Sequence, residues 1–350
     1  MKKLIIRLFT ACLVLSFVIL FSSCQFGDKD NQTREQTPID SENESIIIGV
    51  PYFPTSFFWF LADGLGYLEE EGLDAEIIIY DNNSENIEAI ENNEIDIFGT
   101  AYMQLFSLWD SSDPLVAIAA ADYSYGGDAI ITRKNKNLDS ISDLKDGKIA
   151  VESGTISEFF LDFVLTYRGE ITPEDVEKVN YTVDEATEAF LNNEIDGVVT
   201  FEPFMQDILS QSDEAQIIFD SANERGLIMD VCAVRKENLD KNPEKFIKAF
   251  RAWFKAIEFY KKSPDEAIKI MADAIEMSPE EFAMHLNGIY IMDLRDNVTA
   301  FSIASGFESL YGSGRLIRDF IQEKGLLVEI PEIEVIINDT VVQAVAEDIK

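Results

Sequence analysis

The chain has 350 residues, 47% of them apolar, and a formal net charge of −37 at neutral pH. This length and apolar content are enough for a sizeable core and predict two lobes. So negative a charge argues against binding to nucleic acid and against electrostatic adhesion to anionic lipid.

The N-terminus has the pattern of a secretory signal peptide. Lys2, Lys3 and Arg7 make a basic start, and residues 8–21 follow without a charge. As a helix this stretch would be about 21 Å long, too short for a hydrocarbon layer of roughly 30 Å. We therefore predict a signal peptide over residues 1–23 rather than a membrane-spanning helix.

The stretch "FSSC" at the end of this segment resembles a bacterial lipobox. Ser22 and Ser23 precede Cys24, although Phe21 stands where the pattern usually has Leu. We predict lipid attachment at Cys24, with ordinary cleavage as the alternative. Residues 24–44 contain almost no large apolar side chain and are expected to be a flexible tether. The predicted location is the cell envelope, outside the cytoplasm and lipid-anchored to a bacterial membrane.

From residue 45 onward, strand and helix patterns alternate. The strands "SIIIGV", "DAEIIIY" and "EIDIFGT" enclose two helical segments, "TSFFWFLADGLGYLEEEG" and "SENIEAIENN". The same order recurs with the strands "GKIAVES", "VEKVNY" and "EIDGVVT" around "TISEFFLDFVLTYRG" and "DEATEAFLNN". Two such β-α-β-α-β units predict an α/β protein.

A sequence repeat supports this duplication. Residues 85–100 and 185–200 are identical at nine of sixteen positions, including Asn-Asn-Glu-Ile-Asp in both. Asn tolerates the left-handed backbone that ends a helix, so each Asn pair is interpreted as a helix stop before a buried strand. Asp96 and Asp196 lie about 13 Å of strand away from Thr100 and Thr200. The repeated acids are therefore not expected to form a metal site or a catalytic pair.

We predict a first lobe from residues 45–122 plus 236–345 and a second lobe from residues 123–235. The chain would cross between the lobes twice, near residues 122–127 and 230–235. In open α/β sheets ligands bind outside the carboxyl ends of the strands. The loops at those ends should therefore line one cleft.

Several segments carry a family resemblance: "GLGYLEEEGLDAEI", "NNEIDIFGT", "GGDAIITRKN", "LNNEIDGVVTFEPF" and "NLDKNPEKFIKAF". In this order they are similar to the substrate-binding proteins of ABC importers of the nitrate/sulfonate/taurine type. The resemblance implies a periplasmic-binding-protein fold of type II, with a mostly parallel sheet in each lobe and a two-strand hinge. It also implies a small-molecule ligand, an ABC permease and its ATPase as partners, and we expect a monomer.

The strand-end rule and the resemblance together give a set of candidate ligand-binding residues. They are Tyr52, Phe53, Thr55, Ser56, Thr100, Ala101, Tyr102, Tyr123, Tyr125, Gly126, Ser153, Gly154, Thr155, Phe201 and Glu202. Ser153–Thr155 open a helix, so their N–H groups could hold a partial negative charge.

The chemistry of these loops favours one ligand class. They carry aromatic rings and carboxylates but no Lys or Arg, and the nearest downstream basic residue is Arg225. Aromatic faces with carboxylate acceptors suit an aromatic or heterocyclic nutrient, such as a thiamine pyrimidine precursor or riboflavin. The alternative is a sulfonate, taurine or nitrate anion, held by helix N-termini in place of basic side chains. An envelope sensor or interaction protein of the same fold is a further alternative.

An enzyme is not expected. A eukaryotic relative of this family makes the thiamine pyrimidine with a cysteine-rich cluster and an active-site histidine. This chain has Cys232 as its one mature cysteine and His285 as its one histidine. It has no His-Glu-x-x-His, Cys-x-x-Cys or P-loop, and "YGSGRL" at 311–316 lacks the third glycine of a dinucleotide motif. We predict no catalytic residue, no metal and no cofactor.

Overall fold

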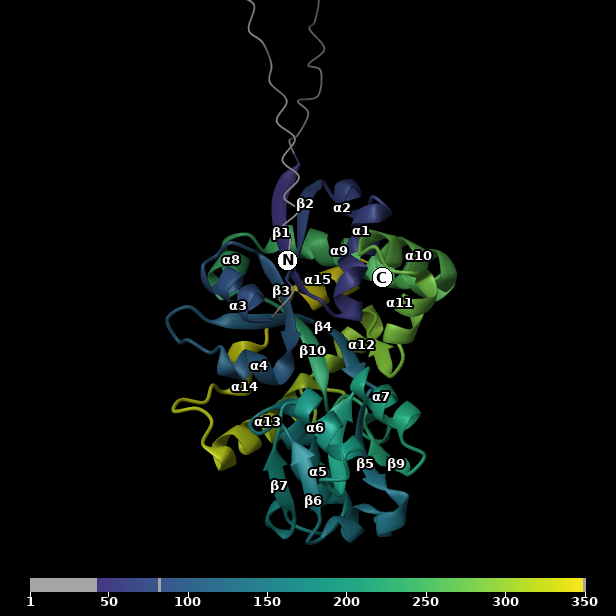
Figure 1. The fold of residues 1–350 in the computed structure, drawn as a ribbon. Helices are drawn as coiled ribbons and strands as arrows, with labels where there is room; N and C mark the ends of the chain where they lie inside the picture. Colours follow the sequence, from purple (N-terminus) through teal and green to yellow (C-terminus); the bar gives the residue numbers. More distant parts are fainter. Residues whose placement is uncertain (1–42, 81–82, 349–350) are drawn as a thin grey trace, which may run out of the picture. The chain divides into compact units, whose positions relative to one another are not determined.

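The computed structural model describes residues 43–80 and 83–348, which form two β-sheets flanked by helices (Figure 1). The first sheet has the strand order β11-β4-β10-β3-β1-β2 and the second has β7-β6-β8-β5-β9. The strands of the first sheet are β1 (Glu44–Pro51), β2 (Leu73–Tyr80), β3 (Ile97–Ala101), β4 (Leu115–Ser124), β10 (Met229–Arg235) and β11 (Ile289–Ile291). Those of the second are β5 (Asp128–Arg133), β6 (Lys148–Val151), β7 (Glu177–Asn180), β8 (Gly197–Phe201) and β9 (Ala215–Asp220).

Both sheets are mixed. The duplicated units supply the parallel parts, β2-β1-β3 in the first sheet and β7-β6-β8 in the second. The remaining neighbours pair antiparallel. Parallel pairing needs a long crossover between strands, and within each repeated unit helices supply it, whereas the antiparallel neighbours are strands that do not follow one another in the chain. The prediction of parallel pairing therefore applies to the repeated units and not to the crossing strands.

Helices cover both faces of each sheet. On one face of the first sheet lie α1 (Phe58–Gly64), α2 (Tyr67–Glu70), α9 (Pro243–Lys262), α10 (Pro264–Ala274), α11 (Pro279–His285) and α15 (Thr340–Asp348). On the other lie α3 (Asn83–Glu91), α4 (Tyr102–Ser107), α13 (Leu310–Lys324) and α14 (Ile333–Ile336). The second sheet has α5 (Ile156–Arg168) on one face and α6 (Val183–Leu191) and α7 (Phe204–Gln211) on the other.

Shorter elements complete the described chain. They are the helices α8 (Lys236–Lys241) and α12 (Leu294–Ala300) and the 3-10 turns η1 (Pro54–Phe57), η2 (Lys134–Lys136), η3 (Ile141–Leu144), η4 (Pro173–Asp175) and η5 (Ser221–Asn223).

The hydrophobic core is continuous from the first sheet to the second on one side. One cluster of buried side chains includes both α4 and α13 of the first part and α5 of the second. Phe159 of α5 meets Phe320 of α13 edge to face, and Phe163 meets Phe307 in the same way. Aromatic pairs of this geometry add to the free energy gained from burial. The two sheets are thus linked by packed side chains as well as by the chain itself.

The chain passes between the sheets twice, from β4 into β5 and from β9 through η5 into β10. Our predicted boundary grouped residues 123–235 in the second lobe. In the structure β10 pairs with β3 and β4 and so belongs to the first sheet. This placement matters for the site, because it brings the start of β10 to the ends of β3 and β4.

The repeated motif has the structural role that the sequence predicted. Asn93 and Asn193 adopt φ values of 58° and 63°, the left-handed conformation that ends α3 and α6. A carboxylate oxygen of Asp96 accepts the N–H of Ile47 at 2.9 Å. Asp196 accepts the N–H of Lys148 at 3.0 Å in the second sheet. Each repeated acid, just before its own strand, therefore binds the backbone of the neighbouring parallel strand.

The predicted signal peptide, Cys24 and nearly all of the predicted tether lie outside the described residues. The last tether residue in our prediction, Glu44, is the first residue of β1. Among the helices that the structure describes, none is long and apolar enough to span a membrane.

Candidate ligand-binding site

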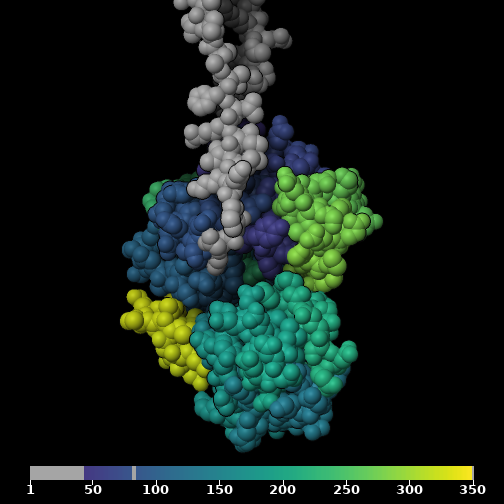
Figure 2. Space-filling model, viewed as in Figure 1, coloured from purple at the N-terminus to yellow at the C-terminus, as the bar shows by residue number. Residues whose placement is uncertain are grey.

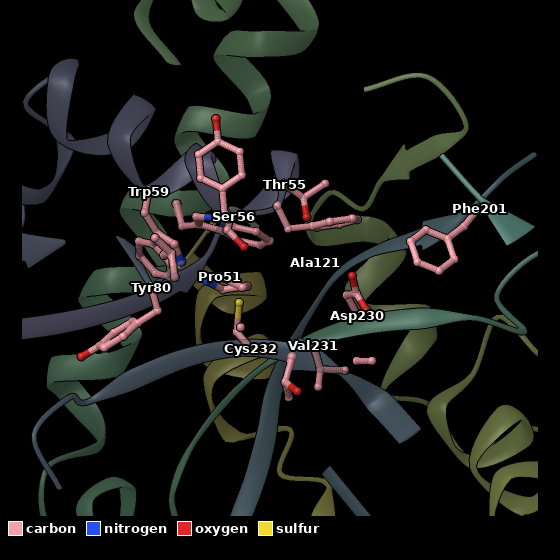
Figure 3. A pocket seen from close by; sticks show the side chains of 17 residues that line it. Pro51, Thr55, Ser56, Trp59, Tyr80, Ala121, Phe201, Asp230, Val231 and Cys232 are labelled. Atoms are coloured by element: carbon pink, nitrogen blue, oxygen red, sulfur yellow. The ribbon is translucent and has the colours of Figure 1, made fainter. Parts of the chain in front are cut away.

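A cavity of about 480 Å³ lies at the carboxyl ends of β1, β2, β3 and β4. Three of these strands are parallel neighbours, so their ends meet at one edge of the sheet. The first residues of β10 complete this edge because β10 runs the opposite way. In Figure 3, Trp59 and Tyr80 lie on one side of the cavity and Phe201 on the other, with Asp230 between them.

Seven of the predicted ligand-binding residues line this cavity. They are Tyr52, Phe53, Thr55, Ser56, Thr100, Ala101 and Phe201. Six of the seven come from the first lobe, and Phe201, at the end of β8, is the one lining residue from the second sheet. A hollow separates the teal surface of the second lobe from the blue and green surface of the first (Figure 2).

Ten further residues line the cavity and were not among our candidates. They are Val50, Pro51, Trp59, Tyr80, Gly99, Ala121, Asp230, Val231, Cys232 and Trp253. Tyr80 ends a strand, so the strand-end rule alone could have found it. Asp230 is a single charge inside the apolar run "LIMDVCAV", which is a signal as well. Trp59 and Trp253 also belong to the buried core of the first sheet, and no local sequence signal separates such residues from ordinary core residues.

The remaining candidates lie elsewhere. Tyr102 is fully buried against α13, where a Cβ on Gly314 would lie 2.7 Å from its hydroxyl oxygen. Tyr123 stacks on Tyr290 with ring centroids 4.6 Å apart. Burial, followed by the neighbouring Tyr290, raises the pKa of Tyr123 to about 12.

Two other candidates, Tyr125 and Gly126, contact residues of the second crossing, and Glu202 lies between β8 and α7. The hydroxyl of Tyr125 accepts a hydrogen bond from Arg225 at 3.1 Å. The N–H of Gly126 donates to the hydroxyl of Ser221 at 2.8 Å. The carboxylate of Glu202 accepts a hydrogen bond from Gln206 within α7. None of the three lines the cavity.

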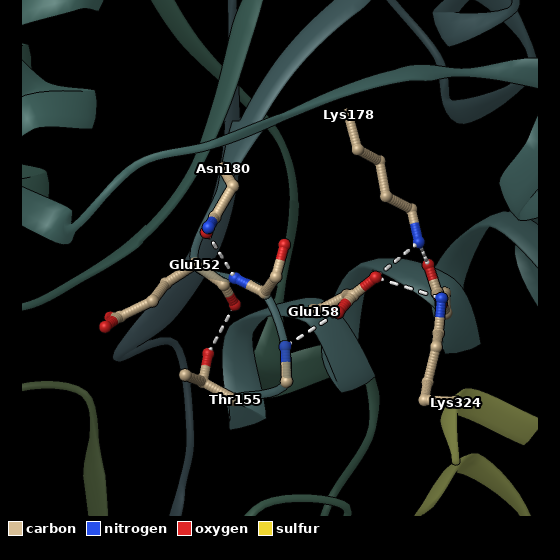
Figure 4. Close-up of polar contacts among 9 residues, drawn as sticks. Glu152, Thr155, Glu158, Lys178, Asn180 and Lys324 are labelled. Atoms are coloured by element: carbon tan, nitrogen blue, oxygen red, sulfur yellow. Dashed lines mark hydrogen bonds and ion pairs between the residues drawn. The ribbon is translucent and has the colours of Figure 1, made fainter. Parts of the chain in front are cut away.

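The loop Ser153–Thr155 has its polar groups engaged within its own lobe (Figure 4). The N–H of Ser153 donates to Asn180, and the N–H of Gly154 donates to the carboxylate of Glu158 at 2.8 Å. The hydroxyl of Thr155 donates to the carbonyl of Glu152. The start of α5 is thus already capped by an anion of the same chain, which is what a helix N-terminus favours.

Glu158 is itself part of an ion-pair network between α5 and α13. Lys324 of α13 contacts Glu158 at 2.9 Å and Asp162 at 2.7 Å, and Lys178 contacts the same two carboxylates. Burial opposes ionisation of Glu158, but the hydrogen bonds from Gly154, Lys324 and Lys178 outweigh it and lower its pKa to about 2.

Three carboxylates lie at or beside the cavity without a basic partner in the described part of the chain. Asp122 of β4 and Asp230 of β10 are direct cross-strand partners, and Asp128 begins β5. Burial raises the pKa of Asp128 to about 6, although a hydrogen bond from Ser124 opposes it. Burial and then the charge of Asp128 raise the pKa of Asp230 to about 7.

Asp122 is more deeply buried than Asp230. Burial, and next the charge of Asp230, raise its pKa well above the usual value, while the hydroxyl of Thr55 donates to it at 2.6 Å. Burial and then both carboxylates also raise the pKa of the Cys232 thiol, so this cysteine is neutral. His285, at the end of α11, does not line the cavity. The described residues contain no group of three or more His, Cys, Asp or Glu that could hold a metal ion.

Two mixed α/β sheets, crossed twice by the chain and carrying a cavity at their strand ends, define the two-lobed binding-protein fold that we predicted. Comparison with known proteins supports this class. Residues 54–267 match the family model described as NMT1/THI5 like. That match spans well over half of the 350 residues, and the chain belongs to this family. No curated protein matches the chain.

Solved structures with a similar fold include periplasmic binding proteins. The aliphatic sulphonate binding protein SsuA from Escherichia coli has a TM-score of 0.68 and 17% identity, covering 85% of this chain and 92% of its own. A putative sulfonate-binding protein SsuA from Methylobacillus flagellatus has a TM-score of 0.71 and 16% identity, with 88% and 95% covered. The nitrate-binding protein NrtA from Synechocystis has a TM-score of 0.62 and 11% identity, with 88% and 90% covered. At these identities the likeness shows the fold, and it confirms the prediction of a two-lobed protein.

Proposed function

We propose that this protein is an extracytoplasmic solute-binding lipoprotein that delivers a small organic nutrient to an ABC permease and its ATPase. The favoured ligand is aromatic or heterocyclic, such as a thiamine pyrimidine precursor or riboflavin. The ligand would bind between the two lobes, stabilise a closed form by contacts with both, and be handed over when that form docks on the permease.

One observation carries this proposal, namely the composition of the cavity wall. Six aromatic side chains line it: Tyr52, Phe53, Trp59, Tyr80, Phe201 and Trp253. Flat rings offer faces on which a planar ligand stacks. Asp230 adds an acceptor for an amino group, and none of the lining residues is Lys, Arg or His.

A sulfonate, taurine or nitrate ligand is the second candidate, because solved proteins of this fold are described as sulfonate and nitrate binders. An anion would need donors. The Ser153 and Gly154 N–H groups at the start of α5 already donate to Asn180 and Glu158. The cavity wall is therefore better suited to an amino-bearing heterocycle.

The ligand is tested by mass spectrometry of whatever small molecule co-purifies, followed by thermal shift with a panel of compounds. We expect a pyrimidine precursor, riboflavin or a related heterocycle to raise the melting temperature. If taurine or an alkane sulfonate stabilises the protein and no heterocycle does, the ligand is an anion and our hypothesis of a heterocyclic ligand is wrong. A gene neighbourhood without a permease and an ATPase would favour an envelope sensor instead.

The lipid anchor is tested by substitution of Cys24. We expect the unaltered protein to sediment with membranes and Cys24→Ser to appear in the soluble fraction, since acyl chains supply the membrane affinity. The matched control is Cys12→Ser, which changes a cysteine within the predicted signal peptide. Soluble unaltered protein would show that cleavage occurs without lipidation.

A further inference from the structure

The carboxylate of Asp230 reaches the cavity without a partner. Among the described residues it makes no hydrogen bond and no ion pair, and it lines the cavity wall. Its cross-strand partner on β4 is Asp122, which is 3% exposed. Side chains of such partners lie on one face of the sheet with Cβ atoms about 5 Å apart. Asp122 therefore lies beside Asp230 in the sheet, and Asp230 is the acid that lines the cavity.

No Lys, Arg or His of the described residues forms an ion pair with either acid. The charges that act on this group are carboxylates, Asp230 on Asp122 and Asp128 on Asp230. None of the cavity-lining residues is basic. A buried carboxylate without a counter-charge is costly, and cores seldom retain one unless something pairs with it. The described residues offer no metal site for this purpose.

An independent observation comes from the aromatic part of the cavity wall. Trp253 lines the cavity and is 1% exposed, and its indole N–H has no acceptor among the described residues. Tyr52, Phe53, Trp59, Tyr80 and Phe201 supply aromatic rings around the same space. Ring faces attract cations. The site thus offers one carboxylate and several rings for a cation, and beside them a buried indole N–H without an acceptor among the described residues.

We infer that the ligand is a small organic cation whose protonated nitrogen carries N–H groups, held by Asp230 among the aromatic rings, with Asp122 behind it. This inference rests on the proposed function and specifies the charge of its ligand. The N–H groups would donate to the carboxylate of Asp230, and an acceptor elsewhere on the ligand would meet the indole N–H of Trp253. The net charge of −37 adds a long-range field that draws cations towards the protein.

The test uses the full chain and three compounds of nearly equal size, the cation benzamidine, neutral benzamide and the anion benzenesulfonate. We expect benzamidine alone to raise the melting temperature and to bind in calorimetry. Asp230→Asn keeps the shape but removes the charge, and we expect it to weaken benzamidine binding about 30-fold or more. Asp74→Asn, an exposed carboxylate on β2, is the matched control and should bind like the unaltered protein.

Each other outcome overturns the inference. These outcomes are no stabilisation by benzamidine, equal or tighter binding of benzamide or benzenesulfonate, stabilisation by Ca²⁺ or Zn²⁺ in place of the organic cation, and unaltered benzamidine binding by Asp230→Asn. Solute binding itself would survive any of them if a small molecule still co-purifies. The proposed function fails separately, if nothing co-purifies and no compound of the wider panel binds.

Discussion

Asp230 carries a consequence for stability that does not depend on any ligand. Burial raises the pKa of Asp230 to about 7 and that of Asp128 to about 6, from an ordinary value of 3.8. A carboxyl with a raised pKa in the folded state binds more protons when folded than when unfolded. The protonated carboxyls of Asp128 and Asp230 therefore contribute fully to the free energy of unfolding below about pH 4. This contribution is lost as the pH rises through 6 and 7. Asp122 and the neutral thiol of Cys232 are the other titratable groups against Asp230.

We therefore expect Asp230→Asn to stabilise the ligand-free protein at pH 8 by roughly 1–4 kcal/mol, because it removes a buried, unbalanced charge. The gain should shrink as the pH falls towards 5, where Asp230 in the unaltered protein takes up a proton. Urea unfolding between pH 5 and 8 measures this. Asp74→Asn should follow the unaltered profile, and a constant gain at every pH would contradict the assignment.

Gly312 lies in α13 at a position where the structure requires a glycine. A Cβ at this position of α13 would lie 1.9 Å from the carbonyl oxygen of Gly306. The motif "YGSGR" therefore serves close packing of α13. We expect Gly312→Ala to lower the free energy of unfolding by about 1–3 kcal/mol through overpacking.

The matched control for this substitution is Gly306→Ala. A Cβ there would meet nothing within 4 Å, so the change should stay within about 0.5 kcal/mol. Both values come from urea unfolding at one pH. Equal losses in the two variants would show that the close approach is not what requires glycine at 312.

At the scale of elements, ion pairs connect α13, which packs on the first sheet, to α5 of the second lobe. The ammonium of Lys324 lies between Glu158 and Asp162, whose side chains are 9% and 10% exposed. Removal of one partner from a poorly solvated pair leaves charges without compensation. Exposed pairs such as Lys269 with Asp273, 66% and 60% exposed, contribute little.

We expect Lys324→Gln to cost about 1–3 kcal/mol of stability near pH 7, and the control Lys269→Gln to cost less than about 0.5 kcal/mol. The pKa of Glu158 is lowered to about 2. The ionised carboxylate therefore stabilises the folded state above pH 4.5, and this stabilisation is lost as the pH falls towards 2. The deficit of Lys324→Gln should therefore narrow in acid. Thermal melts from pH 7 down to pH 3 check this, and a deficit that widens in acid would refute it.

Some elements could be predicted from the sequence and others could not, because only some of them depend on local preferences. The repeat, the left-handed Asn93 and Asn193 and the strands after them follow from local preferences, and the structure has them. The sheet in which β10 pairs depends on contacts distant in sequence. That pairing places Asp230 at the cavity. The start of α5 was a candidate site because of its local pattern. In the structure Glu158 accepts the N–H of Gly154 there, and Lys324, which is distant in sequence, contacts the same carboxylate.

For the whole molecule, the proposed function requires the two lobes to close on the ligand, and the cavity wall shows what closure would have to bring together. Sixteen of the seventeen lining residues belong to the first lobe, and Phe201 alone comes from the second sheet. Two crossing segments, at residues 124–128 and 220–229, join the sheets, and the α5–α13 contact is packed with rings and ion pairs. Because packed interfaces resist deformation, the lobes should pivot near that contact and approach each other on the cavity side.

We expect a bound ligand to lower the radius of gyration measured by solution scattering, since contacts with both lobes favour the closed form. Phe201→Ala removes the one ring that the second sheet offers to the cavity. It should weaken binding by about tenfold and reduce the compaction, because a ligand held by one lobe has little differential affinity for the closed state. Phe204→Ala, a neighbouring ring that does not line the cavity, is the control. Calorimetry must show binding in each scattering sample. Binding without compaction would mean that the first lobe holds the ligand alone, and the handover to a permease would then need a signal other than closure.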